Sequence, residues 1–458
     1  MLEFDPVLIE RYSGSGPRYT SYPTADRFHS GFTGAEYARA IADRNDRWGS
    51  EPLSVYVHLP FCSSLCFYCA CNKVITRDRT RSVKYVGYLG REIGLVRERI
   101  EGSPRVAQLH WGGGSPTFLS HPEMAKLMQM LHAAFEFTSD AALAIEVDPR
   151  TVSAETVEFL ARLGFNRMSV GIQDFDPVVQ HAVNRVQTEE ETRTAIDAAR
   201  ANGFRSVNAD LIYGLPRQSV SGFVRTLERV IGLSPDRIAL YSYAHVPHLF
   251  KPQRKIALQE LPTAQEKLAI LTLAIERLIG AGYLYIGMDH FAKPDDELAR
   301  AQRERRLHRD FQGYSIGPGG DLLAFGVSAI GRIGDTYAQN AKSIDGYYAS
   351  LDAGALPVVR GIALDADDVL RRAVIQALMC EFRIDYATVD AAHRIRFLDY
   401  FRSELAALEP LAVDGLVAID DDGITVTMRG RLLVRAIAMR FDRHWSRALQ
   451  HATHSKII

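Results

Sequence analysis

The sequence lacks the features that would direct a chain into a membrane, out of the cell or onto nucleic acid. No apolar run approaches the roughly 18 residues of a membrane span. The start, MLEFDPVLIERY, has acidic residues where a secretion signal needs a basic region and an apolar stretch. Lys and Arg total 54 against 55 Asp and Glu, so no overall charge attracts nucleic acid or an anionic membrane. We therefore expect a cytoplasmic protein with no membrane span and no nucleic-acid partner.

Cysteine is scarce and unevenly placed. Four of the five cysteines fall between Cys62 and Cys71, and the fifth, Cys380, stands in the apolar context VIQALMC. Structural disulfides are rare in a reducing compartment, where clustered thiols indicate metal or redox chemistry. The cysteine cluster is thus the first candidate for a functional site.

A repeated pattern of strand and helix from about Leu53 to Ala329 predicts the core of the fold. Near-continuous apolar runs typical of buried parallel strands occupy residues 54–61, 106–111, 143–149, 166–173, 206–214 and 237–244. Amphipathic helices lie between them, with a capping box at Thr188 and Glu191 and a closing glycine at Gly203. This alternation predicts an α/β protein with a parallel sheet, and six units favour an incomplete (β/α)6 barrel.

The pattern divides the chain into three expected regions. Residues 1–50 form a tail and lead-in helix covering the active site, residues 51–335 form the barrel, and residues 336–458 form a small helical domain with a β-wing. The wing consists of two short strands around a DDDG turn. Winged modules often bind DNA, but the three aspartates at this tip favour a lid or packing role. Nothing in the sequence demands more than a monomer.

Cys62, Cys66 and Cys69 form a C-x3-C-x2-C loop directly after the first expected strand. A parallel α/β fold places its active site at this end of its strands. Three thiolates can hold three irons of a 4Fe-4S cluster and leave the fourth iron open to a small molecule. The alternative is a structural zinc site with Cys71 as fourth ligand, although such sites usually draw paired ligands from separate elements.

This loop, placed after the first strand of a βα repeat, resembles the radical S-adenosylmethionine (SAM) superfamily, in which the open iron binds SAM. The narrower resemblance is to the oxygen-independent coproporphyrinogen III oxidases, and it spans nearly the whole chain. The matching segments are GPRYTSYPTA, YVHLPFCSSLCFYCACNK, HWGGGSPT, IEVDPR, GFNRMSVGIQDF, VNRVQ, DLIYGLP and GMDHFAKPDDEL. Against the relatives, this chain has Ser115 where threonine is frequent and Ala70 where glycine is frequent.

The resemblance implies two SAM molecules besides the cluster. The residues implied for the first are Tyr56, Tyr68, Gly113, Glu146 and Ile330. The residues implied for the second are Gly114, Ser115, Gln173, Arg185, Asp210 and Ala244. Read without the resemblance, the charged residues near strand ends could equally form structural ion pairs, and Ala244 and Ile330 would pass as core residues. Buried His58 could tune the cluster, donate a proton, or only satisfy its own hydrogen bonds.

The implied reaction converts two propionates of coproporphyrinogen III to vinyl groups through a 5′-deoxyadenosyl radical, with electrons from a donor such as flavodoxin or ferredoxin. The expected catalytic residues are Tyr56, Glu146 and Arg18. Arg18 is included because its guanidinium, in a tail rich in Gly, Pro and Tyr, can bind a substrate carboxylate. We expect this tail to present Arg18, Tyr19 and Tyr22 over the barrel mouth. A basic run after the cysteine loop is interpreted as a solvated face: Lys73, Arg77, Arg79, Arg81 and Lys84.

Two alternatives share the same scaffold. One is a haem-binding chaperone, and the other is a radical methyltransferase or haem-opening enzyme. The chaperones lack the GPRYTSYP tail and the cysteine corresponding to Cys71, both of which are present here. The tail also disfavours the second alternative.

Overall fold

The computed structural model describes residues 5–12, 14–47, 51–316 and 319–445, which form two compact units. The barrel unit consists of Phe28–Gly282 and Gly317–Ala363, and the terminal unit consists of Met1–Arg27, Tyr283–Ile316 and Leu364–Ile458. These boundaries differ from the expected ones, because the sheet of the barrel unit continues through residues 336–363. The expected boundary at residue 50 lies outside the described residues.

Six parallel strands form the centre of the barrel unit and confirm the α/β class. They are β1 (Leu53–Leu59), β4 (Arg105–Gly113), β5 (Glu136–Val147), β6 (Arg167–Gln173), β7 (Ser206–Tyr213) and β8 (Arg237–Ser242). Each strand pairs in parallel with the next in this order. All six expected runs are therefore strands, although β5 begins at Glu136, well before residue 143.

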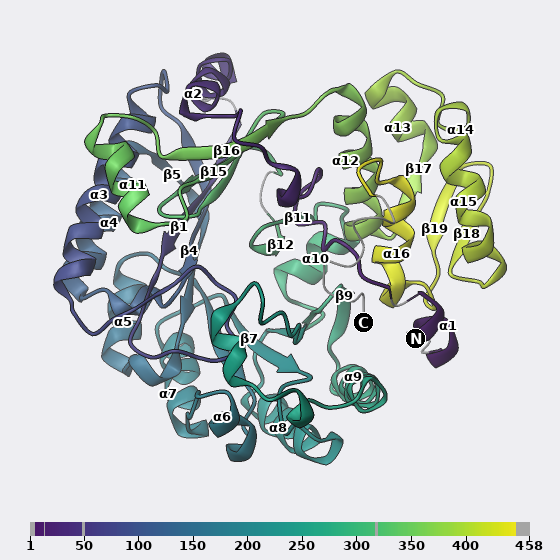
Figure 1. Cartoon of the computed structure of the whole chain (residues 1–458), viewed down its shortest axis with the longest axis horizontal. Coiled ribbons are helices and arrows are strands. Elements are labelled where there is room, and N and C mark those ends of the chain that lie inside the picture. Colours follow the sequence, from purple (N-terminus) through teal and green to yellow (C-terminus); the bar gives the residue numbers. More distant parts are fainter. Residues whose placement is uncertain (1–4, 13, 48–50, 317–318, 446–458) are drawn as a thin grey trace. The chain divides into compact units, whose positions relative to one another are not determined.

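Seven helices connect these strands or follow the last of them. They are α3 (Thr80–Arg97), α4 (His121–Ala134), α5 (Ala154–Arg162), α6 (Pro177–Ala182), α7 (Glu189–Ala201), α8 (Val220–Leu233) and α9 (Ala264–Gly280). In Figure 1 the helices from α3 to α8 follow the outer side of the strands. The expected capping box of α7 is present, since Thr188 and Glu191 bond each other's backbone N–H groups. Gly203 has the left-handed φ of +76° that ends this helix.

The sheet continues on the other side of β1. There β13 (Leu322–Phe325) pairs with β1 in parallel, and an antiparallel extension follows through β14 (Ile330–Ile333), β15 (Thr336–Asn340) and β16 (Val358–Ala363). Smaller elements complete the unit: α2 (Gly34–Ala42), β2 (Phe61–Cys62), β3 (Val74–Ile75) and α11 (Ile344–Asp352).

A buried carboxyl group on α3 holds this extension. Glu92 accepts hydrogen bonds from the Gly326 N–H at 2.7 Å, the Asn340 amide at 2.6 Å and the Tyr347 hydroxyl at 2.6 Å. Burial raises the pKa of Glu92 from 4.5 to about 7, although these hydrogen bonds act in the opposite direction. Its charge state therefore changes near neutral pH.

The terminal unit is mainly helical and contains the expected β-wing. Its helices are α1 (Pro6–Tyr12), α10 (Glu297–Arg303), α12 (Ala366–Glu381), α13 (Tyr386–His393), α14 (Phe397–Tyr400), α15 (Arg402–Val413) and α16 (Val434–Ala438). Its strands are β9 (Leu284–Gly287), β10 (His290–Ala292), β11 (His308–Asp310), β12 (Gly313–Ser315), β17 (Arg383–Asp385), β18 (Val417–Ile419) and β19 (Gly423–Val426). The aspartate turn lies between β18 and β19, and β17 pairs with β19 as a third strand. No helix among the described residues is long and apolar enough to cross a membrane.

The N-terminal tail is anchored within the terminal unit by buried hydrogen bonds. Arg435, which is 2% exposed, donates to the carbonyl oxygens of Gly16 and Pro17. Tyr19 donates to Asp442 at 3.0 Å, and the Tyr22 hydroxyl accepts the N–H of Arg443 at 3.1 Å. Both tyrosine side chains are fully buried. Their hydroxyl groups therefore bond within the terminal unit, and the expectation that they face the barrel mouth together with Arg18 stays a prediction.

Candidate active site

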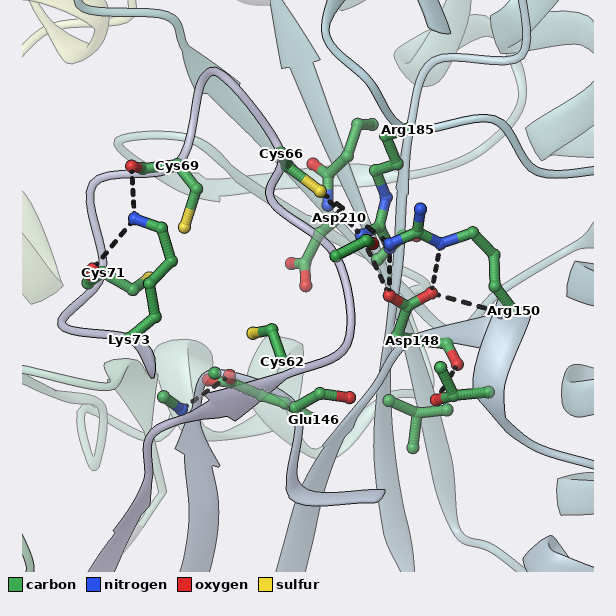
Figure 2. A pocket seen from close by; sticks show the side chains of 18 of the residues that line it. Cys62, Cys66, Cys69, Cys71, Lys73, Glu146, Asp148, Arg150, Arg185 and Asp210 are labelled. Carbon is green, nitrogen blue, oxygen red and sulfur yellow. Dashed lines mark hydrogen bonds and ion pairs between the residues drawn. The ribbon is translucent and has the colours of Figure 1, made fainter. Parts of the chain in front are cut away.

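The barrel unit contains a cavity of about 290 Å³ at the carboxyl ends of its parallel strands (Figure 2). The last residues of β4, β5 and β6 line it, as expected for an active site in a parallel α/β fold. Most of the site residues expected from the sequence also line it: Cys62, Cys66, Cys69, Tyr68, Gly113, Gly114, Ser115, Glu146, Gln173, Arg185 and Asp210. The fold thus brings residues from four strands and the cysteine loop to one place.

The cysteine loop, residues 60–76, is fixed by backbone and side-chain contacts on both sides. The Phe67 N–H donates to the Val183 carbonyl at 2.9 Å, and the Asn184 amide donates to the Leu65 carbonyl at 2.7 Å. Its aromatic residues Phe67 and Tyr68 pack against an apolar cluster below the loop. These contacts anchor the loop within the barrel unit.

Gln253 connects the cysteine loop to the segment after β8. Its amide nitrogen donates to the Tyr68 carbonyl at 3.2 Å and to the Ala244 carbonyl at 3.1 Å. Its amide oxygen accepts the Val246 N–H at 2.5 Å, and the residue is only 1% exposed. One buried side chain therefore satisfies three backbone groups from two loops.

The thiols differ in their electrostatic surroundings. Burial raises the pKa of Cys62 to about 12. A hydrogen bond with Cys71 lowers the pKa of Cys69, and the charge of Lys73 acts in the same direction. Lys73 also donates to the carbonyls of Cys69 and Cys71 at 2.9 and 3.2 Å, as the dashed lines in Figure 2 mark. It is thus part of the loop, whereas the other four cations of the basic run are exposed as expected.

Glu146 is held at the floor of the cavity by residues of β4. Its carboxylate accepts the Gly113 N–H at 3.1 Å and lies 3.2 Å from the His110 ring nitrogen. Burial would raise the pKa of Glu146, but His110 and the Gly113 N–H outweigh burial and lower it. Glu146 is therefore an anion at neutral pH, suited to an ammonium or hydroxyl partner.

The glycine tract is required by close packing within the chain. A Cβ on Gly113 would lie 2.6 Å from the His58 ring, and one on Gly114 would lie 2.7 Å from the Pro60 backbone. His58 itself is 6% exposed and satisfied, since its ring nitrogens contact the Tyr56 hydroxyl at 3.0 Å and the Asn72 carbonyl at 2.9 Å. Burial lowers the pKa of His58, which favours the neutral ring.

Arg185 and Asp148 form an ion pair beside Cys66. Arg185 donates to the Gly171 carbonyl at 2.6 Å and lies 3.3 Å from Asp148 and 3.7 Å from the Cys66 sulfur. Its Nε atom is buried and has no hydrogen-bond partner among the described residues. Arg150 binds the same carboxylate through two nitrogens, at 2.6 and 2.9 Å. Arg185 thus lines the cavity as a cation with one buried, unused donor.

Gln173 and Asp210 add polar groups on the β6 and β7 side. The amide oxygen of Gln173 is buried without a partner among the described residues, and its φ of +66° is strained for a residue other than glycine. Asp210 accepts hydrogen bonds from Ser169 at 2.7 Å and Asn208 at 2.8 Å. Burial raises the pKa of Asp210 to about 6, although these hydrogen bonds lower it.

Four expected site residues are not in the cavity lining. Tyr56 lies on β1 with its ring stacked on His110 at 5.8 Å, and Ala244 follows β8 with its carbonyl bound to Gln253. Ile330 is the first residue of β14. Arg18 belongs to the terminal unit, where it forms an ion pair with Asp289.

The cavity also contains functional candidates that sequence reasoning missed. Asp148 and Arg150 line it just after β5, and Ser169 lines it from β6. The available signal was the segment DPR, which places both charges at the carboxyl end of a predicted strand. Gln253 gave no such signal, because its partners lie far away in the sequence.

The donor set fits an iron–sulfur cluster with bound SAM. Thiols are the ligands that such clusters require, and the cavity is lined by Cys62, Cys66, Cys69 and Cys71 together with Arg185 and Gln173, each of which has a buried polar atom without a partner among the described residues. Within the described ranges, no three His, Cys, Asp or Glu side chains converge on a point that one metal ion would fill.

Comparison with known proteins first defines the class. Residues 56–230 match the family model of the radical SAM superfamily, and residues 364–433 match the model described as the HemN C-terminal domain. The barrel with its cysteine loop is therefore a radical SAM catalytic domain.

Full-length relatives define the family more narrowly. Proteins named oxygen-independent coproporphyrinogen III oxidase from Pseudomonas aeruginosa and Escherichia coli K12 are 49% and 48% identical, over 100% of this chain and 99% of each relative. A solved structure described as coproporphyrinogen III oxidase (HemN) from Escherichia coli, a radical SAM enzyme, superposes with a TM-score of 0.92. It has 47% identity and covers 97% of this chain and 100% of its own. The chain belongs to the family of oxygen-independent coproporphyrinogen III oxidases.

Proposed function

We propose that this protein converts the propionate side chains on two rings of coproporphyrinogen III to vinyl groups without oxygen, giving protoporphyrinogen IX. One observation carries the proposal: a single cavity gathers the three cysteines with Glu146, Arg185 and Asp210, in a chain almost half identical over its full length to oxidases of that name. The same relatives favour this activity over haem chaperoning or methyl transfer.

In the proposed reaction each propionate loses one hydrogen atom from its β-carbon, one carbon dioxide and one electron. When bound, a 4Fe-4S cluster and SAM would supply the 5′-deoxyadenosyl radical that removes the hydrogen atom. Cys62, Cys66 and Cys69 would hold the cluster. The lowered pKa of Cys69 supports its binding as a thiolate.

The chain offers residues for two SAM molecules. For the first, Tyr56, Tyr68, Gly113 and Ile330 would surround Glu146, whose anionic carboxylate suits an ammonium group or ribose hydroxyl. For the second, the unpaired Nε of Arg185 and the unpaired amide oxygen of Gln173 support a further polar ligand. Gly114, Ser115, Asp210 and Ala244 would complete that site.

The substrate carries four carboxylates, and Arg18 is the proposed cation for one of them. The Arg18 side chain is 32% exposed, so a carboxylate could share its guanidinium with Asp289. We also propose a flavodoxin or ferredoxin as electron donor, a monomeric state, and the cytoplasm as compartment. Five free cysteines support a reducing environment.

The test is anaerobic reconstitution with iron and sulfide, followed by incubation with coproporphyrinogen III, SAM and dithionite. The proposal predicts protoporphyrinogen IX together with 5′-deoxyadenosine. Arg18→Ala should raise the substrate KM while 5′-deoxyadenosine formation without substrate stays at the parental level. A loaded protein that cleaves SAM but leaves coproporphyrinogen unchanged would refute the proposed substrate.

A further inference from the structure

Two guanidinium groups point at the same cysteine sulfur in the cavity (Figure 2). Nη2 of Arg150 lies 3.8 Å from the Cys66 sulfur, and Nη1 of Arg185 lies 3.7 Å from it. Both side chains are largely buried, at 17% and 9% exposure. Such contacts are weak with a neutral thiol and become charge-assisted with a thiolate. Cys66 therefore lies in a locally cationic environment formed by two guanidinium groups.

Asp148 is the counter-charge of this pair. Its carboxylate binds Arg150 through Oδ1 at 2.9 Å and Oδ2 at 2.6 Å, and Oδ2 also lies 3.3 Å from Arg185. One anion thus serves two cations, and the three side chains together leave one net positive charge beside Cys66. At 14% exposure, Asp148 is partly shielded from solvent screening.

We propose that Arg150 and Asp148 set the reduction potential of the cluster bound through Cys66, a role separate from holding SAM or substrate. This inference rests on the proposed cluster at Cys62, Cys66 and Cys69. One-electron reduction adds negative charge to a cluster, so a nearby cation stabilises the reduced state and a nearby anion stabilises the oxidised state. Arg150 makes the cluster easier to reduce, and Asp148 makes it harder.

The test compares two substitutions that should act in opposite directions. Arg150→Gln removes the positive charge and should lower the midpoint potential. Asp148→Asn removes the negative charge and should raise the potential, while asparagine can still cap the turn that follows β5. For each variant we expect about a tenfold change in the ratio of reduced to oxidised cluster at a fixed solution potential, which corresponds to about 59 mV. The readout is the electron paramagnetic resonance signal of the reduced cluster during redox titration, without SAM.

Two further variants separate charge from structure. Arg150→Lys keeps the charge and should stay near the parental potential. Arg162→Gln removes an exposed cation on α5 that pairs with Glu158, and it should leave the potential unchanged. Iron content and circular dichroism establish that each variant is folded and loaded.

The outcomes separate this inference from the proposed function. Loaded variants with parental potentials, or shifts of the same sign in Arg150→Gln and Asp148→Asn, would overturn the inference alone. A parental protein that takes up no iron after reconstitution would overturn the proposed cluster site and this inference with it.

Discussion

Replacing Gln253 by methionine should loosen the cysteine loop without touching a cysteine. Methionine has the length of glutamine and a slightly larger volume, but it cannot replace the hydrogen bonds of glutamine. The Tyr68 and Ala244 carbonyls and the Val246 N–H would each lose a buried partner. Each unsatisfied buried group costs about 1–3 kcal/mol. Because water can bond some of the three groups, we expect the ordered loop to lose about 2–4 kcal/mol of stability in total. Because 1.4 kcal/mol is a factor of ten, the ordered loop should be disfavoured by roughly 30-fold or more.

The assay is the rate at which a reconstituted cluster is lost to an iron chelator under anaerobic conditions. The Gln253→Met variant should lose iron at least tenfold faster than the parent. Gln218→Met is the matched control, because Gln218 is 6% exposed, is hydrogen-bonded through both amide atoms and has no bond to the cysteine loop. Parental iron loss in Gln253→Met, or equally fast loss in Gln218→Met, would refute the role of Gln253 as an anchor of the loop.

The other predictions concern separate groups. Substitution of any of the three proposed cysteine ligands by alanine should abolish the cluster, whereas Cys71→Ala should retain parental iron and absorbance; cluster loss in the Cys71 variant would contradict the ligand set. Asp210→Ala should weaken one of two SAM sites in equilibrium binding while the cluster survives, and unchanged stoichiometry and affinity would count against the second site. The protonated form of Glu92 stabilises the folded protein. This contribution to the free energy of unfolding is complete below pH 4.5 and is lost as the pH rises through about 7. The raised pKa corresponds to about 3 kcal/mol in the free energy of unfolding. When the pH is raised from 5 to 8, the urea concentration at the unfolding midpoint should therefore decrease more for the parent than for Glu92→Gln. Identical pH dependence in both proteins would contradict this.

The barrel strands could be predicted because their residues alternate between buried and half-buried positions, so that the strands read as nearly continuous apolar runs. Their carboxyl ends meet at one edge of the sheet, so an active site at that edge could be expected, whereas the assignment of Glu146, Gln173 and Asp210 to it came from the family resemblance. Unit boundaries could not be predicted in the same way. The pairing of β13 with β1 joins segments more than 250 residues apart, and no local pattern encodes such a partner.

The same limit applies to single residues. The hydrogen bonds of Tyr19 and Tyr22 with Asp442 and Arg443, which lie more than 400 residues away in the sequence, could not be predicted from their sequence neighbours. Gln253 is an ordinary polar residue in the sequence, and its role comes from three backbone groups that only the fold brings to it. Burial and long-range partners, rather than residue type, decide these cases.

The most direct test of the central claim uses coproporphyrinogen III with deuterium at the β-carbons of its propionates. The reconstituted protein is incubated with this substrate, SAM and a reductant, and 5′-deoxyadenosine and porphyrinogen products are analysed by mass spectrometry. Radical abstraction predicts deuterium in 5′-deoxyadenosine and two of these molecules for each protoporphyrinogen IX formed. Deuterium-free 5′-deoxyadenosine from a mixture that forms product, or product formed without SAM, would contradict the account.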